Sequence, residues 1–299
     1  MDILCFGSLN IDHVYAVPHF VQAGETLSSA SLHSGCGGKG LNQSIALSRA
    51  GASVRHAGLV GQDDNMLRPL LADNGVDITA VRTADVPSGH AIIQVDESGQ
   101  NCILLYSGAN RAIDRSFVCE VLDTCRAGDI LLLQNEISEI RTLLEEGAAR
   151  GLRIAFNPAP ITAELADMPI GIAEWLFVNE TEGAALSGET ANDRIITALR
   201  EKYPHTTVIL TVGGDGVIAA DDAGIHRLPA MKVPVADTTA AGDTFIGYFL
   251  AAVAEGSDLQ GSLHTASAAS ALTVSRAGAA ASIPMADEVK RFLQGRQAD

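Results

Sequence analysis

Asp237 and Asp243 flank a run of small residues just before an apolar helical pattern. Small side chains let a ligand approach the backbone, and a helix opening at Gly242 presents unpaired N–H groups and a positive dipole end to an anion. A carboxylate in the first helical turn, as at Asp243, can take a proton from an attacking hydroxyl. The stretch therefore indicates phosphoryl transfer. An ordinary helix start, with a dipole-favoured aspartate and tightly packed small residues, explains it equally well.

A second candidate is the glycine-rich run from Ser34 to Gln43, which carries one cation, Lys39. It is not a P-loop, because that motif needs Ser or Thr after the lysine and Gly40 stands there. Its glycines favour close approach of backbone to a ligand, with Lys39 and Asn42 as side-chain contacts. The alternative is a flexible loop that precedes a helix over residues 41–50.

The sequence pattern predicts alternating strands and helices, which would hold these candidate residues in position. The apolar run Ile3–Phe6 predicts a buried parallel strand, and Asn10 and Asp12 follow it closely. Four further strands, expected at 130–134, 152–156, 174–178 and 207–212, also end in polar or glycine-rich turns. Because ligands of open α/β sheets bind at the carboxyl ends of strands, we expect a site along that edge, although single turns are usually structural.

The composition narrows the possible partners. The chain has 299 residues and a formal net charge of -16, which argues against nucleic acid and anionic membrane surfaces. Its five scattered cysteines include no C-x-x-C pair, which favours a reducing cytoplasm over a disulfide scaffold or zinc site. The N-terminus lacks the features of a signal peptide, and no apolar run is long enough to span a membrane.

We expect one α/β domain over residues 1–299, because no linker or internal repeat divides the chain. Two segments break the alternation, at about 12–34 and 89–107. The second has a hairpin signal around Glu97–Gln100. Together they predict a β lid that excludes water from the site.

The two signature stretches, Gly35–Gln43 and Asp237–Phe245, resemble those of the ribokinase-like (PfkB-type) carbohydrate kinases. Blocks at 7–12, 157–160, 179–182 and 213–216 are similar to further family blocks, so the resemblance runs almost end to end. It implies a three-layer α/β/α fold with a mainly parallel central sheet and a small β-sheet lid.

The resemblance also implies roles for individual residues. Asp243 is expected to be the general base, and the backbone N–H groups of Ala240, Ala241, Gly242 and Asp243 to hold the transferring phosphate. The sugar is expected to contact Asn10, Asp12, Gly38, Lys39, Asn42 and Glu136, with Ala91 and Ile103 of the lid covering its ring.

For the nucleotide, the resemblance implies Asn179 and Glu182 near Mg²⁺ and the ATP phosphates, with Thr211, Gly213, Gly216 and Ser267 along the rest of the site. An activating K⁺ is expected at Asp237, Thr239, Thr273, Arg276, Gly278 and Ser282, mainly on backbone carbonyls. A structural carboxylate that fixes the loop is the alternative role for Asp237. Two stretches, Gly214-Asp215 and 279–281, are plainer than in many relatives, which bears on nucleotide affinity.

The implied reaction is transfer of the γ-phosphoryl of ATP to O5 of D-ribose. The alternatives are a kinase of the same fold acting on another sugar or a nucleoside, and a sugar- or nucleotide-binding regulator without turnover. Apolar Ile92, Ile93, Ile103 and Leu105 in the lid predict a homodimer in which lids pair.

Overall fold

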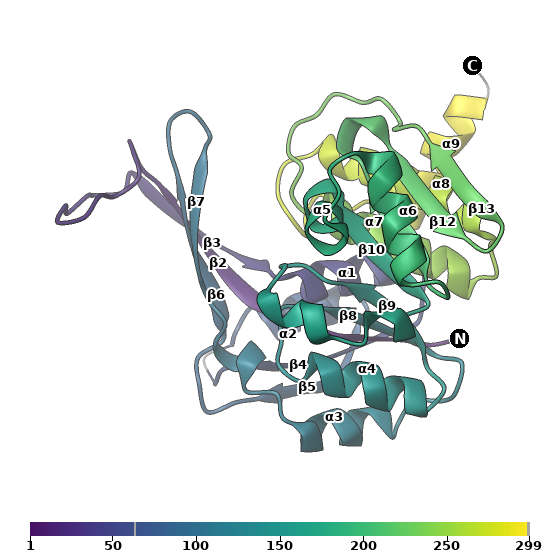
Figure 1. The fold of residues 1–299 in the computed structure, drawn as a ribbon. Helices are drawn as coiled ribbons and strands as arrows, with labels where there is room; N and C mark the ends of the chain where they lie inside the picture. Colours follow the sequence, from purple (N-terminus) through teal and green to yellow (C-terminus); the bar gives the residue numbers. More distant parts are fainter. Residues whose placement is uncertain (63, 298–299) are drawn as a thin grey trace.

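A computed structural model describes residues 1–62 and 64–297. Nine strands form its central sheet in the order β13-β12-β11-β10-β9-β8-β1-β4-β5 (Figure 1). Those from β11 to β5 are parallel, and the β12–β13 hairpin adds an antiparallel edge. The strands are β1 Ile3–Phe6, β4 Val54–Val60, β5 Asp77–Thr83, β8 Ile130–Gln134, β9 Arg153–Asn157, β10 Trp175–Asn179, β11 Thr207–Thr211, β12 Val217–Asp221 and β13 Gly224–Leu228.

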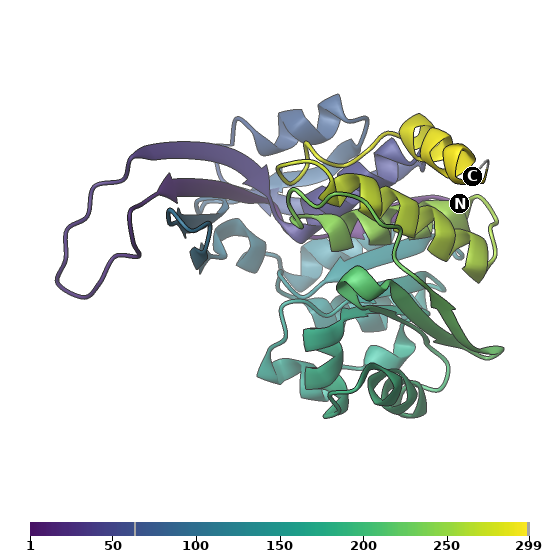
Figure 2. The ribbon, with the colours of Figure 1, turned by 90° about the horizontal axis from the view of Figure 1, so that it is seen from above.

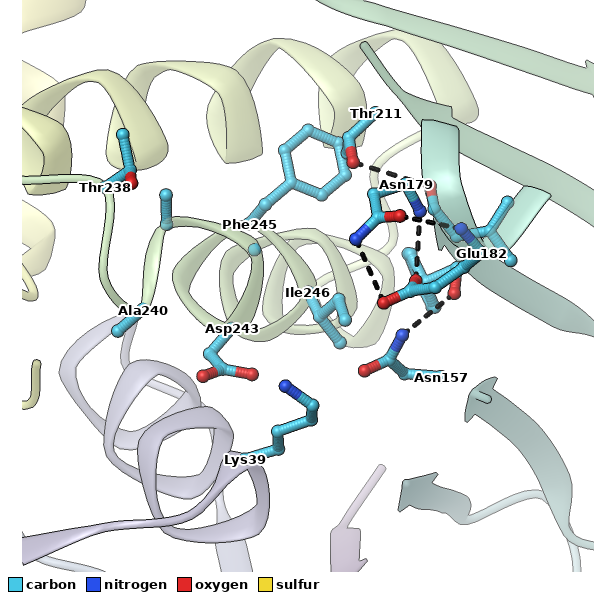
Figure 3. Close-up of a pocket in the computed structure, with 14 residues that line it drawn as sticks. Lys39, Asn157, Asn179, Glu182, Thr211, Thr238, Ala240, Asp243, Phe245 and Ile246 are labelled. Atoms are coloured by element: carbon cyan, nitrogen blue, oxygen red, sulfur yellow. Dashed lines mark hydrogen bonds between the residues drawn. The ribbon is translucent and has the colours of Figure 1, made fainter. Parts of the chain in front are cut away.

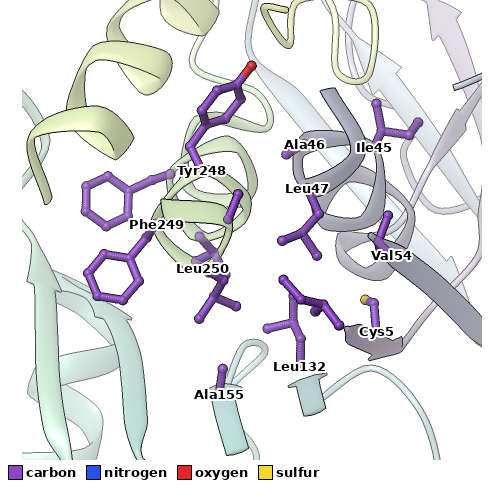
Figure 4. Packing of buried hydrophobic residues seen from close by; sticks show 14 of the residues in the cluster. Cys5, Ile45, Ala46, Leu47, Val54, Leu132, Ala155, Tyr248, Phe249 and Leu250 are labelled. Atoms are coloured by element: carbon purple, nitrogen blue, oxygen red, sulfur yellow. The ribbon is translucent and has the colours of Figure 1, made fainter. Parts of the chain in front are cut away.

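Helices cover both faces of this sheet, because alternate strand residues point to opposite sides. In β1, Ile3 and Cys5 join one apolar cluster, and Leu4 and Phe6 join the other. The first cluster, shown in part in Figure 4, packs under α1 Lys39–Arg49, α2 Leu67–Asp73, α7 Ala241–Ala254, α8 Leu259–Val274 and α9 Ala286–Gln297. The second packs under α3 Arg115–Leu122, α4 Ile140–Ala149, α5 Glu180–Ser187 and α6 Asn192–Lys202.

A smaller sheet of four strands projects from one side of the body (Figures 1 and 2). Its order is β3-β2-β6-β7, built from β2 Asn10–Ala16, β3 Ser31–Gly37, β6 Gly89–Val95 and β7 Asn101–Tyr106. β2 runs antiparallel to β3 and parallel to β6, which forms a hairpin with β7. We call this sheet the lid.

The α/β class with a mainly parallel sheet and a small second sheet is confirmed. Each strand expected at the carboxyl edge is present within a residue or so. The antiparallel β12–β13 edge and β5 were not expected. Helix α7 begins at Ala241, one residue before the expected Gly242, because Ala240 takes a left-handed conformation with φ of 59°. No helix among the described residues is long and apolar enough to cross a membrane.

Candidate active site

Two helix N-termini meet at the carboxyl edge of the sheet, and they bring the two signature stretches together. α1 begins at Lys39 and α7 at Ala241, and the helices pack closely enough that a Cβ on Gly247 would lie 2.4 Å from Cβ of Ala46. Asn42 Nδ2 donates to Asp243 Oδ2 at 3.0 Å. The Asp243 carboxylate is therefore held by α1 rather than by its own helix.

A buried chain of amides continues from this carboxylate into the sheet. Gln43 Nε2 donates to Asp243 Oδ1 at 2.9 Å, and Gln134 Nε2 donates to Gln43 Oε1 at 2.7 Å. Gln43 and Gln134 are fully buried, so the chain fixes the orientation of the carboxylate. Neither residue was predicted to have a role. A glutamine beside Asn42 in the first signature, and one ending a strand at the carboxyl edge, were the available signals.

Asp243 borders a cavity of about 210 Å³, and the N-terminus of α7 forms part of the cavity wall (Figure 3). The amides of Gly242 and Asp243 have no acceptor among the described residues, since both precede the first intrahelical hydrogen bond. Ala241 N donates at 3.3 Å to Thr238 O, so this amide is partly engaged. Two open amides and the helix dipole make the cavity suited to an anion. Its lining comprises Lys39, Asn157, Phe177, Val178, Asn179, Glu182, Thr211, Thr238, Ala240, Ala241, Gly242, Asp243, Phe245 and Ile246.

Lys39 supplies the cation of this cavity. Its Nζ lies 3.9 Å from Glu136 Oε1, and its backbone N–H donates to Glu136 Oε2 at 3.0 Å. Burial alone lowers the pKa of Lys39, but the carboxylates of Asp243, Glu136 and Glu182 more than offset this and raise it. The ammonium is thus charged at neutral pH and can neutralise a bound anion.

The sugar-site candidates from the lid and the first strand lie next to this cluster. Asn10 and Asp12 lie at the start of strand β2. Their side chains share one face of the strand, because successive side chains alternate between the two faces. Burial, with the negative charge of Glu136, raises the pKa of Asp12 to about 6. Ala91 of β6 lies opposite Asp12 of β2 in the parallel strand pair and is buried. Ile103 on β7 lies opposite Ile93 of β6 and is 56% exposed.

The nucleotide-site candidates fall into two groups. Asn179 and Glu182 form a capping box at the start of α5: Glu182 N donates to Asn179 Oδ1 at 2.9 Å and Asn179 N to Glu182 Oε2 at 3.0 Å. Both line the cavity with Thr211. Gly213, Gly216 and the half-buried Ser267 of α8 lie outside its lining. A Cβ on Gly216 would lie 2.1 Å from Leu228 O, which gives that glycine a packing role.

The candidates for a cation site centre on Asp237. Its Oδ1 accepts from Thr239 N at 2.9 Å, and its Oδ2 from Gly278 N at 2.9 Å, so the carboxylate ties the α7 loop to the loop after α8. Burial acts to raise the pKa of Asp237, but these hydrogen bonds hold it below its ordinary value.

The other candidates for this site have partners of their own. Thr273 Oγ1 donates to Thr244 Oγ1 at 3.0 Å, and Ser282 Oγ to Ala279 O at 2.8 Å. Arg276 pairs with Glu288 at 2.7 Å. These side chains therefore all take part in hydrogen bonds or an ion pair within the protein.

Comparison with known proteins identifies the family of these signatures. A family model described as pfkB family carbohydrate kinase matches residues 1–286. The ribokinase of Schizosaccharomyces pombe is 36% identical over 97% of this chain and 96% of its own length. That of Haemophilus influenzae is 33% identical over 96% of this chain and 97% of its own. A deoxyribokinase of Salmonella typhi is 31% identical over 98% and 99%, respectively.

Solved structures agree with the sequence relatives. The ribokinase of Thermotoga maritima has a TM-score of 0.88 and 34% identity, covering 98% of this chain and 99% of its own. The ribokinase of Cryptococcus neoformans, solved in complex with ADP, has a TM-score of 0.85 and 33% identity, covering 97% of this chain and 99% of its own.

Proposed function

Because the chain belongs to the pfkB family of carbohydrate kinases, which are phosphotransferases with an alcohol group as acceptor, we propose that it transfers the γ-phosphoryl group of ATP to O5 of D-ribose. The observation that carries this proposal is the Asp243 carboxylate, which Asn42 and Gln43 orient beside the open amides of α7. A regulator without turnover has no need of such an oriented base.

In the proposed reaction, one carboxylate oxygen of Asp243 accepts the proton of the sugar hydroxyl. At the same time the hydroxyl oxygen forms a bond to the γ-phosphorus. The bond between that phosphorus and the β–γ bridging oxygen breaks, and ADP leaves with the electron pair. The amides of Gly242 and Asp243, with the Lys39 ammonium, stabilise the charge on the transferring group. The chain thus acts mainly by positioning and by charge neutralisation.

The proposed reaction includes Mg²⁺ and K⁺, because the oxygen-bearing groups at two places in the chain are suited to bind these ions. The carboxylate and amide oxygens of Glu182 and Asn179 line the cavity, and Mg²⁺ binds through one or two such groups plus waters and phosphates. It would offset phosphate charge there. Asp237, with backbone oxygens of the loop around Gly278, offers the all-oxygen environment that K⁺ favours. Its charge would bias the adjoining α7 loop toward anion binding.

We also propose that two copies pair through their lids, in a cytoplasmic enzyme. The residues of β7 are exposed along its whole length and none is charged. Among the lid strands only Asp12 carries a formal charge, on a chain with net charge -16, so the lid is where two acidic copies can approach. Residues 1–299 form one functional unit in this proposal.

The test is ADP release with ATP, Mg²⁺ and K⁺ and a panel of ribose, other sugars and nucleosides. We expect turnover with ribose, and a loss of about 10²–10⁴-fold or more in kcat for Asp243→Asn, which removes the base and one of the two acceptors for Asn42 and Gln43. Asp222→Asn changes an exposed carboxylate elsewhere and should leave kcat unchanged. Ribose binding without ADP release by the wild type would favour a regulator, and near-normal turnover of Asp243→Asn would exclude the base role.

A further inference from the structure

Asn110 is a buried asparagine at the junction between the lid and the body. It lies in the short 3-10 turn Gly108–Arg111 that follows β7 and is 1% exposed. Its Oδ1 accepts from Leu9 N at 3.0 Å, and its Nδ2 donates to Leu9 O at 3.3 Å and to Asn10 Oδ1 at 2.7 Å. Asn110 thus binds both the backbone before β2 and the first side chain of the candidate sugar site.

The backbone of Leu9 fixes which way both amides point. Its N–H can only donate, so Asn110 must present Oδ1 there and Nδ2 on the other side. Asn10 must then present Oδ1 to Asn110, which leaves Asn10 Nδ2 free. Within the described part of the chain, Asn10 makes its side-chain hydrogen bond through Oδ1 alone.

Gly89 makes room for this pair. A Cβ at position 89 would lie 2.2 Å from Asn110 Nδ2 and 2.3 Å from Asn10 Oδ1, so only glycine leaves the two amides in contact. Gly89 is also the residue of β6 that pairs with Asn10. The contact between the two asparagines is therefore built into the start of the lid.

We propose that Asn110 is a positioning residue that sets the hydroxyl specificity of the acceptor site, a role that rests on the proposed sugar-kinase function. It makes Asn10 a donor beside Asp12, an acceptor on the same face of β2. A sugar hydroxyl both accepts and donates, so it satisfies the two groups at once. A deoxy sugar that lacks this hydroxyl leaves a site nitrogen and a carboxylate unpaired, and such sites reject the analogue strongly.

Asn110→Asp tests this directly. In its ionised form the introduced carboxylate still accepts from Leu9 N but has no proton to donate to Leu9 O or to Asn10, so Asn10 turns its Nδ2 toward the second oxygen and shows Oδ1 to the sugar. Because burial raises the pKa of a carboxyl, the kinetics are measured at alkaline pH, which favours the ionised form. We expect kcat/KM for ribose to fall at least ~10-fold. We expect 2-deoxyribose or 3-deoxyribose, whichever lacks the bridged hydroxyl, to be affected much less, so that selectivity collapses.

A double-mutant cycle with Asn10→Ala separates positioning from stability. In that background Asn110→Asp should cause no further change in the ribose to deoxyribose ratio, because it acts through Asn10. Asn74→Asp, a half-buried asparagine at the end of α2, is the matched control and should keep the wild-type ratio. Thermal unfolding checks that each variant folds.

The outcomes are distinct. Equal loss for ribose and both deoxy sugars, or an undiminished effect of Asn110→Asp in the Asn10→Ala background, would overturn the positioning role. Absence of wild-type turnover with every sugar would instead overturn the proposed function.

Discussion

Asp12 is the carboxylate whose ionisation should set the pH range of the proposed sugar site. Burial and the neighbouring Glu136 raise its pKa to about 6, and only the ionised form accepts a hydrogen bond from a sugar hydroxyl on both oxygens. Sugar affinity should therefore be full above pH 6 and fall as pH drops below it.

We predict that KM for ribose rises up to about tenfold per pH unit below pH 6, with a smaller change in kcat, because one proton is involved. The measurement is KM from pH 4.5 to 8 for the wild type and Asp12→Asn. The variant should have a high KM without this acid limb. The same limb in Asp12→Asn would assign the titration to another group.

His56 is a second residue whose ionisation has a measurable consequence, here for stability. It is fully buried, Ser44 Oγ is its hydrogen-bond partner at Nδ1, and burial lowers its pKa to about 4. The unfolded chain binds a proton near pH 6.5, but the folded one does not until about pH 4. Stability that is present above pH 6.5 is therefore lost as pH falls through this window.

Between pH 7 and pH 5, His56 should remove about 2 kcal/mol from the free energy of unfolding. Urea unfolding at the two pH values measures this loss. His56→Gln should show a smaller pH dependence than the wild type, whatever its absolute stability. His205→Gln, at an exposed position, should retain the wild-type slope. Equal slopes for all three proteins would contradict a neutral buried His56.

The geometry of the candidate active site depends on the contact between the helices α1 and α7. Gly247 lets these helices approach, and the approach brings Asn42 and Gln43 within hydrogen-bond distance of Asp243. Asp243 lies on α7 but its carboxylate is held by two residues of α1, so the spacing between the helices decides whether these hydrogen bonds form.

Gly247→Ala should therefore reduce both stability, by about 1–3 kcal/mol from overpacking, and kcat, because the helices must separate. Chemical unfolding and steady-state kinetics measure the two effects. Gly295→Ala in α9 is the matched control, since nothing lies within 4 Å of its added Cβ. It should be neutral or stabilising by up to about 1 kcal/mol. Unchanged kcat in Gly247→Ala would mean that the helix spacing does not limit catalysis.

At the scale of the whole molecule, the lid projects from the body (Figures 1 and 2). It carries exposed apolar side chains on both faces. Ile103 and Leu104 are 56% and 69% exposed and point to opposite faces of β7. An uncovered sheet of this kind is unusual in a monomer, and a second copy is the cover that we propose.

Sedimentation velocity and small-angle scattering should show a dimer for the wild type. Ile103→Asp or Leu104→Asp should weaken it at least ~10-fold, according to which face is buried. Ile225→Asp, on the edge strand β13 at the far end of the main sheet, should not. A monomeric wild type, or a dimer unaffected by both lid variants, would contradict lid pairing.

Much of this architecture could be predicted from the sequence, because its signals are local. Apolar runs such as Ile130–Gln134 are buried on both faces and identify parallel strands without tertiary information. The period change near Glu97–Gln100 likewise indicated the lid hairpin. Strand β13 was not expected: it lies at a half-exposed edge, where the pattern of Gly224–Leu228 is weak.

The sequence by itself determined which chemistry the chain carries: a carboxylate at a helix N-terminus, one lysine in a glycine-rich run, and polar turns after parallel strands. Only the tertiary structure decided how these groups are oriented. Gln134, Gln43 and Asp243 come from three separate elements, and Asn110 reaches Asn10 across the base of the lid. Hydrogen-bond direction between residues far apart in the chain follows from packing, which no local pattern encodes.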